Sequence, residues 1–186
     1  MQGIEQQKFG EPLSDFSLPT LNGGTDSLGS ALQGKKGAVV VVWSSTCSHC
    51  LRYDKYLNAF EGRHPDLGLV VVSARVGETL ESARKAASQR GLTFRLLHDP
   101  TSIVAKTWYT QQTPRAFLMD AARRLLYRGA IDNFKFPEDP EHVSYLEPAI
   151  QQFRSGTPIA RPEVTSYGCS IQSVYYNLPK VFTKGV

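Results

Sequence analysis

Two cysteines, Cys47 and Cys50, directly follow the most apolar run of the chain, residues 38–44. The run is β-branched and continuous, which is typical of a strand buried on both faces of a sheet. After the pair, Tyr53, Leu57 and Phe60 continue from Cys50 at helical spacing. The amide groups of a helix's first turn lack intrahelical acceptors and favour a thiolate over a thiol. The pair at this strand-to-helix junction therefore predicts a redox site.

The rest of the chain alternates between strand-like and helix-like segments. We expect a hairpin at 16–28, a helical turn at 29–34, and further strands at 67–74, 94–97, 116–119 and 125–131. We expect helices at 79–90, after Asp99-Pro100, and from Val143 to a stop at Gly156. This order predicts an α/β domain over 1–156, with helices on both faces of a central sheet. Residues 157–186 form a C-terminal extension that carries Cys169 and is expected to be irregular.

Composition narrows the classes of function. A chain of 186 residues with 41% hydrophobic and 20% charged residues suits one folded core. The net charge of +4 comes from scattered basic residues, so we expect no nucleic-acid partner. No apolar stretch is long enough to span a bilayer, and residues 1–15 lack a secretory signal. The mature form of an exported protein would look the same, and we favour the bacterial periplasm over the cytoplasm.

Several motifs together resemble a known family. They are Phe16-Ser17-Leu18-Pro19, Asn22-Gly23-Gly24, Trp43 with the Cys-x-x-Cys, Val76-Gly77-Glu78, Leu97-His98-Asp99 and Thr113-Pro114. Over residues 10–155 the chain resembles the redoxin branch of the thioredoxin-like superfamily, which includes TlpA/ResA-like thiol-disulfide oxidoreductases and the AhpC/TSA group. The resemblance implies a thioredoxin-like fold with a central mixed β-sheet and an N-terminal β-hairpin. It also implies that Pro114 is cis and lies beside the cysteines, so that Thr113 offers backbone groups to an extended substrate.

The chain departs from this pattern at three places. Thr46 replaces the family's tryptophan before the first cysteine, and Val41 replaces a buried acid of thioredoxin. Tyr53 stands where ResA-like proteins carry a glutamate. A carboxylate proton relay at these places is therefore absent, and Asp54 is expected on another helical face.

The roles of the cysteines follow from their order. We expect Cys47 to be the nucleophile of a thiol-disulfide oxidoreductase and Cys50, one turn later, to resolve the mixed disulfide. His49 either stabilises the Cys47 thiolate or is an exposed bystander. Trp43 is expected mainly in the core, with a partial role at the site.

Cys169 lies in a Gly-Cys-x-Ile segment that resembles the tail of some redoxin-domain proteins. One hypothesis is that the tail folds back and Cys169 exchanges with Cys47 or Cys50 as a third redox thiol. A structural cysteine without redox function is equally compatible with the sequence.

Two other functions stay open. In a thiol peroxidase, Cys47 would react with peroxide, Cys50 or Cys169 would resolve, and Ser44 would imitate the threonine of peroxiredoxins. In a copper-binding metallochaperone the pair would hold Cu(I), although its spacing is one residue shorter than in related copper-delivery proteins. For the leading function we expect no metal and no cofactor; the partners are protein thiols or disulfides and an upstream electron donor or acceptor. We expect His64, His98 and His142 to be surface residues.

Overall fold

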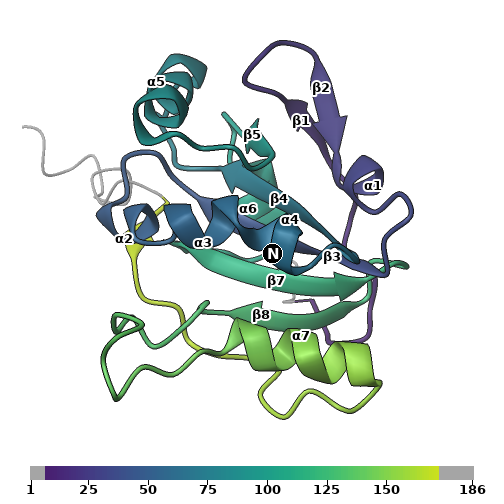
Figure 1. The fold of residues 1–186 in the computed structure, drawn as a ribbon. Coiled ribbons are helices and arrows are strands. Elements are labelled where there is room, and N and C mark those ends of the chain that lie inside the picture. Colours follow the sequence, from purple (N-terminus) through teal and green to yellow (C-terminus); the bar gives the residue numbers. More distant parts are fainter. Residues whose placement is uncertain (1–6, 172–186) are drawn as a thin grey trace, which may run out of the picture.

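The computed structural model describes residues 7–171. The strands are β1 (Ser17–Pro19), β2 (Thr25–Ser27), β3 (Gly37–Trp43), β4 (Leu67–Ser73), β5 (Leu96–His98), β6 (Gln112–Thr113), β7 (Arg115–Asp120), β8 (Leu125–Gly129) and β9 (Cys169–Ser170). The helices are α1 (Leu28–Ala31), α2 (Ser48–Leu51), α3 (Asp54–Asn58), α4 (Phe60–Arg63), α5 (Leu80–Arg90), α6 (Ile103–Thr107) and α7 (Leu146–Ser155). Figure 1 shows them around one twisted sheet.

The central sheet has five strands in the order β5-β4-β3-β7-β8. β3 lies in its middle, parallel to β4 and antiparallel to β7. Every residue of β3 and β4 is buried, as the continuous apolar runs predict for strands covered on both faces. The expected mixed sheet and the N-terminal hairpin of β1 and β2 are confirmed.

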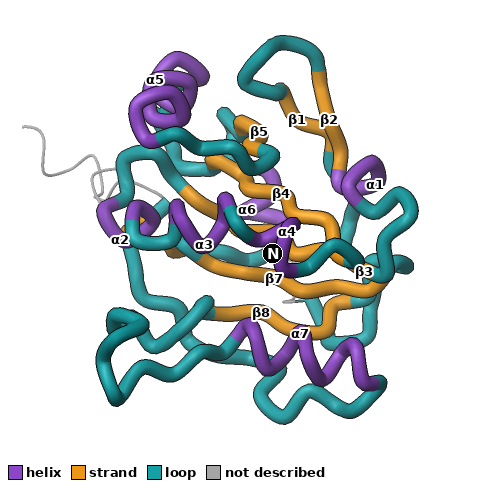
Figure 2. Tube along the Cα trace, in the orientation of Figure 1, coloured by secondary structure: helices purple, strands orange, loops and turns teal. Residues whose placement is uncertain are grey.

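Alternate residues of β3 point to two separate hydrophobic cores. Val39, Val41 and Trp43 face the core that is covered by α2, α3, α4 and α7. Val40 and its neighbours at even positions face the second core, which is covered by α1 and α6. Figure 2 shows α2 to α4 in front of the orange strands and α6 behind them. The helices therefore lie on both faces of the sheet, as expected.

The segment after the cysteines differs from the expected single helix. It is divided into α2, α3 and α4, with breaks where Tyr53 and Ala59 have ψ angles of 2° and −3°. At such angles a backbone amide bonds to the carbonyl three residues before it instead of four, as the Tyr53 amide does to the Cys50 carbonyl. The expected buried face survives, since Cys50, Tyr53, Leu57 and Phe60 are all buried.

Two other helices begin later than the sequence indicates. Asp99 does act as a cap, because its carboxylate accepts from the amides of Ile103 and Val104 at 2.9 Å. The helix itself begins at Ile103, since Ser102 has a left-handed φ of 54°. At the other end of the chain, α7 begins at Leu146, and Val143 lies outside it and is exposed.

The C-terminal extension runs back across the sheet edge. Arg128 in β8 pairs with Glu163 at 2.8 Å, and the Val164 amide donates to the Arg128 carbonyl at 3.1 Å. Further on, β9 pairs with β6, so the expected irregular tail contains a short strand. The remaining residues of the extension, 172–186, lie outside the described part of the chain. Within residues 7–171, no helix has the length and apolar character needed to cross a membrane.

Candidate active site

Cys47 lies where β3 has ended and α2 begins, facing the chain around Pro114. Cys47 is the N-cap residue of α2, and its side chain is buried. The peptide bond between Thr113 and Pro114 is cis, as the resemblance implied. As a thiol, Cys47 donates a hydrogen bond from Sγ to the Thr113 carbonyl oxygen at 3.3 Å. The structure thus brings Cys47, Cys50, Thr113 and Pro114 into one site.

Hydrogen bonds to sulfur favour the ionised form of Cys47. The Cys50 thiol is the main cause, and Cys169 and Thr113 add to it; against the opposing effect of burial they lower the pKa of Cys47 from 9.0 to about 4. A thiolate is the nucleophilic form of cysteine. At neutral pH Cys47 is therefore present mainly as the thiolate.

Cys50 has the opposite character. Burial, and next the neighbouring Cys47, raise the pKa of Cys50 well above 9.0. Cys50 therefore keeps its proton at neutral pH and serves as a hydrogen-bond donor to the Cys47 thiolate. All three cysteines are free in this structure.

The third cysteine lies at the same place. In the pairing of β6 with β9, Cys169 stands opposite Thr113, and its carbonyl accepts from Thr113 Oγ1 at 3.4 Å. Burial and the neighbouring Cys47 raise the pKa of the Cys169 thiol. Hydrogen bonds from the backbone amides of His49 and Ser48 to its sulfur oppose this shift. The described part of the extension, residues 157–171, does fold back to the site. Redox exchange by Cys169 stays a prediction.

The two aromatic candidates take different positions. Trp43 is buried in the core on the cysteine side of the sheet, 6.3 Å from the ring of Phe94 and below the guanidinium of Arg90. The ring of His49 is half-buried and stacks at 4.6 Å on Phe134 from the loop after β8. The imidazole is therefore packed against Phe134 rather than freely exposed, and its effect on the Cys47 thiolate stays a prediction.

Sequence reasoning missed a buried carboxylate behind the cysteine loop. Glu78 accepts from Ser44 Oγ at 2.6 Å and from the Ser45 amide at 2.9 Å, and it also accepts from Ser73 Oγ. These bonds hold the residues between β3 and Cys47. The Val76-Gly77-Glu78 motif was visible in the sequence, but nothing there indicated which groups the carboxylate would bind.

A second carboxylate lies close to the place where this chain has Tyr53 instead of the glutamate of ResA-like proteins. Tyr53 donates from its hydroxyl to Asp132 Oδ1 at 2.6 Å, and His142 Nε2 lies 3.3 Å from Asp132 Oδ2. Burial, and next Asp132, raise the pKa of Tyr53, so the phenol stays protonated. A carboxylate is thus present near the pair after all, but Tyr53 lies between it and the cysteines. Asp54, expected on another face of the helix, forms an ion pair with Arg90.

Removal of the Glu78 carboxylate should destabilise the fold. Glu78→Ala leaves the Ser44 and Ser73 hydroxyls and the Ser45 amide without their acceptor, and each unsatisfied buried group costs about 1–3 kcal/mol. We expect the free energy of unfolding to fall by about 3 kcal/mol or more, as measured by urea denaturation of the reduced protein. Glu138→Ala is the control, because Glu138 is exposed. Equal stability of the two variants would contradict the role given to Glu78.

The expectation that all three other histidines lie on the surface is wrong for two of them. His64 and His98 are each 5% exposed. His64 lies between Glu147 at 3.1 Å and Arg154 at 3.0 Å, partners more than 80 positions away that spacing along the sequence could not reveal. Across residues 7–171, no group of three or more His, Cys, Asp and Glu side chains is arranged to hold a metal ion.

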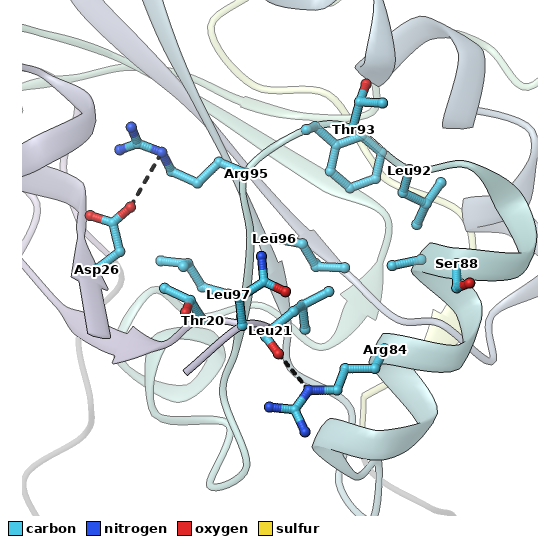
Figure 3. A pocket seen from close by; sticks show the side chains of 13 residues that line it. Thr20, Leu21, Asp26, Arg84, Ser88, Leu92, Thr93, Arg95, Leu96 and Leu97 are labelled. Carbon is cyan, nitrogen blue, oxygen red and sulfur yellow. Dashed lines mark hydrogen bonds and ion pairs between the residues drawn. The ribbon is translucent and has the colours of Figure 1, made fainter. Parts of the chain in front are cut away.

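Two of the clefts on the surface of residues 7–171 differ in how they lie relative to the site. One, of about 580 Å³, lies between the β1–β2 hairpin and α5; Figure 3 shows Arg84 and Arg95 at its sides, engaged with Leu21 and Asp26. None of the cysteines lines it. Another cleft, of about 950 Å³, adjoins the site through Arg52, Tyr53 and Asp132 and extends to the exposed ring of Phe136.

Comparison with known proteins identifies the family. The sequence profile of the AhpC/TSA family matches residues 9–128. The chain belongs to the AhpC/TSA family. Among curated relatives in this comparison, the thiol-disulfide oxidoreductase ResA of Geobacillus kaustophilus is 31% identical over 111 residues, which are 60% of this chain and 63% of that protein. The chain thus matches somewhat less than two thirds of that relative's length.

Solved structures agree on the fold. A hypothetical protein, SMc02350 of Sinorhizobium meliloti, is 26% identical with a TM-score of 0.78, and the match covers 91% of this chain and 97% of that one. A putative thiol:disulfide interchange protein DsbE of Chlorobium tepidum has a TM-score of 0.61 at 21% identity, covering 77% of this chain and 96% of that one. The thioredoxin-like fold expected for this AhpC/TSA member is therefore confirmed.

Proposed function

We propose that this protein is a thiol-disulfide oxidoreductase in which Cys47 attacks and Cys50 resolves. The observation that carries the proposal is the contrast between two adjacent thiols: the pKa of Cys47 is lowered to about 4, and that of Cys50 is raised above 9.0. One sulfur is therefore nucleophilic at neutral pH, while the other is held beside it as a protonated thiol.

The chemistry proceeds in two exchanges. The Cys47 thiolate attacks one sulfur of a substrate disulfide, and the second substrate sulfur leaves as a thiolate. The Cys50 thiol passes its proton to that leaving group and attacks Cys47, which releases the first substrate sulfur. The substrate is reduced by two electrons, and Cys47 and Cys50 end as a disulfide. An upstream thiol donor restores the pair, and the same steps in reverse oxidise a substrate.

Neighbouring groups support these steps. Thr113 and Pro114 form the wall against which Cys47 rests, through the contact of Sγ with the Thr113 carbonyl oxygen. His49 and Trp43 flank the pair, from the half-buried rim and from the core. Protein disulfides are the substrate class we propose. The periplasmic location favoured by the sequence stays a prediction.

Peroxide reduction is the second candidate. The AhpC/TSA family profile covers residues 9–128, and peroxide chemistry needs only a reactive thiolate and a resolving thiol. Ser44 argues against it, since its hydroxyl donates to Glu78 at 2.6 Å and is thereby turned toward that carboxylate. Peroxide consumption at a rate above that of disulfide exchange, lost in Cys47→Ser, would favour this candidate.

Removal of both potential resolving thiols should trap the first intermediate. A Cys50→Ser, Cys169→Ser double variant retains the nucleophile Cys47 but has no second thiol to resolve the mixed disulfide. We expect a stable one-to-one mixed disulfide between Cys47 and a disulfide-bonded protein such as insulin, detected by non-reducing mass spectrometry and peptide mapping.

The control adds Cys47→Ser to that double variant, and the resulting cysteine-free protein should form no adduct. Absence of a trapped adduct on Cys47, with the protein folded and the substrate oxidised, would contradict the proposed function.

A further inference from the structure

The strand edge beside Cys47 already has an occupant from the same chain. β6 consists of Gln112 and Thr113, and among the described residues its pairing partner is β9. Ile171 extends the pairing, since its amide donates to the Gln111 carbonyl at 3.0 Å. An extended polypeptide that binds a protein by strand addition uses backbone groups of this kind. β9 therefore takes up the edge that is nearest to the nucleophile.

The fit of this segment leaves no room for a side chain at Gly168. A Cβ at Gly168 would overlap the Thr113 carbonyl oxygen and lie 2.7 Å from the Thr113 carbonyl carbon. Both atoms belong to the backbone next to the cis peptide bond, so they cannot rotate away. Close apposition of these two backbones thus requires glycine at 168.

Ile171 anchors the far end of the segment. Its side chain is 2% exposed and packs in the core below α1 and α6, and its carbonyl accepts from the Val76 amide at 3.0 Å. Strand pairing on one side and core packing on the other fix the intervening Cys169. The segment is therefore a docked element of the fold, placed over a buried Cys47.

Cys169 stands where a substrate sulfur would have to be. It is opposite Thr113 in the strand pairing, while Thr113 contacts Cys47 Sγ. Its packing places it against the core cluster that holds Cys47 and Cys50. An extended substrate that paired with Thr113 in the same register would present its own cysteine at this position.

We propose that Gly168–Ser170 is a tethered pseudosubstrate, which occupies the strand edge intended for an extended polypeptide and places Cys169 beside Cys47 in lieu of the substrate sulfur. This inference rests on the proposed function and adds how access to the site is controlled. A polypeptide disulfide can pair with Gln112 and Thr113 only after β9 has moved away. Tethering gives β9 an effective concentration in the millimolar range, against which a substrate competes.

The same geometry defines an internal exchange. When Cys47 carries a mixed disulfide with a small thiol, the Cys169 thiol attacks Cys47; the Cys47–Cys169 bond forms and the bond to the small thiol breaks. The small thiol leaves with the proton that Cys169 releases, so the electron count is unchanged.

Gly168→Ala tests occupancy of the edge. The added methyl group should displace β9, so that insulin reduction and the alkylation of Cys47 by iodoacetamide both become several-fold faster than in the wild type. Gly62→Ala in α4 is the matched control, since a Cβ there meets no atom within 4 Å. A second variant, Ile171→Ser, weakens the anchor and should act in the same direction. Unchanged or slower rates in both variants, with the fold intact by circular dichroism, would overturn the proposal.

Disulfide mapping tests the placement of the sulfur. Cys50→Ser, which retains Cys169, should react with oxidised glutathione and accumulate an internal Cys47–Cys169 disulfide. A triple variant, Cys50→Ser with Cys169→Ser and Ser170→Cys, moves the thiol by one residue to the opposite side of the strand. In this variant glutathione should stay on Cys47. If glutathione stays on Cys47 in both variants, the proposed function stands and the pseudosubstrate is refuted. If no adduct forms on Cys47 in any variant, the proposed function itself has failed.

Discussion

Cys47→Ser is expected to reduce disulfide reduction by about 10³-fold or more, to the uncatalysed background. A serine hydroxyl cannot form the sulfur–sulfur bond of the mixed disulfide, and the hydrogen bonds that stabilise a thiolate at this position have no comparable anion to act on. The measurement is the initial rate of insulin reduction with a thiol donor in excess.

The matched control is Ser48→Ala, which changes an exposed neighbour of Cys47 by one oxygen atom. Its backbone amide remains, so we expect a rate close to that of the wild type. A Cys47→Ser variant that retained a substantial part of the activity would place the nucleophile elsewhere and contradict the proposed mechanism.

The second large effect concerns pH. In the reduced protein, Cys47 is expected to ionise with a midpoint near pH 4, because hydrogen bonds from Cys50 and then Cys169 favour its thiolate. The ultraviolet absorbance of the thiolate, followed during acid titration, measures this midpoint. Cys50→Ala removes the leading donor and should raise the pKa of Cys47 toward 9.0, and Cys169→Ala should raise it less.

The sign of the linked stability follows from the lowered pKa. In the folded state the pKa of Cys47 is below its ordinary value of 9.0, so ionisation stabilises the reduced fold fully above pH 9 and progressively less as the pH falls through about 4. Stabilisation of the thiolate also favours the reduced pair, so we expect a reduction potential above the about −270 mV of thioredoxin. A Cys47 midpoint near 9 would contradict both expectations.

The elements predicted well are those whose signal is local. The run in β3 is apolar throughout because both faces of the strand are covered, and this alone predicted a strand buried on both faces. The Cys-x-x-Cys could be placed at a strand-to-helix junction because strand and helix periods change at that point in the sequence.

The parts that could not be predicted depend on long-range partners. Glu78 meets Ser44 across 34 positions, and Asp132 meets Tyr53 across 79. The position of neither carboxylate in the sequence indicates that it lies near the cysteines. Cys169 could be named as a candidate, but its pairing with Thr113, 56 positions away, depends on the path of an extension that has no regular period. Only the folded chain brings these groups together.

The ion pair between Arg128 and Glu163 limits how far β9 can move from its edge. Val164 is held to the Arg128 carbonyl, and only three residues lie between it and Gly168. The four Cα–Cα steps from Val164 to Gly168 span at most about 14 Å when fully extended, so β9 can move off β6 but stays close to the site. In the proposed pseudosubstrate role, this short connection would return β9 to its edge when a substrate departs, and it would direct Cys169 to the Cys47 of the same molecule.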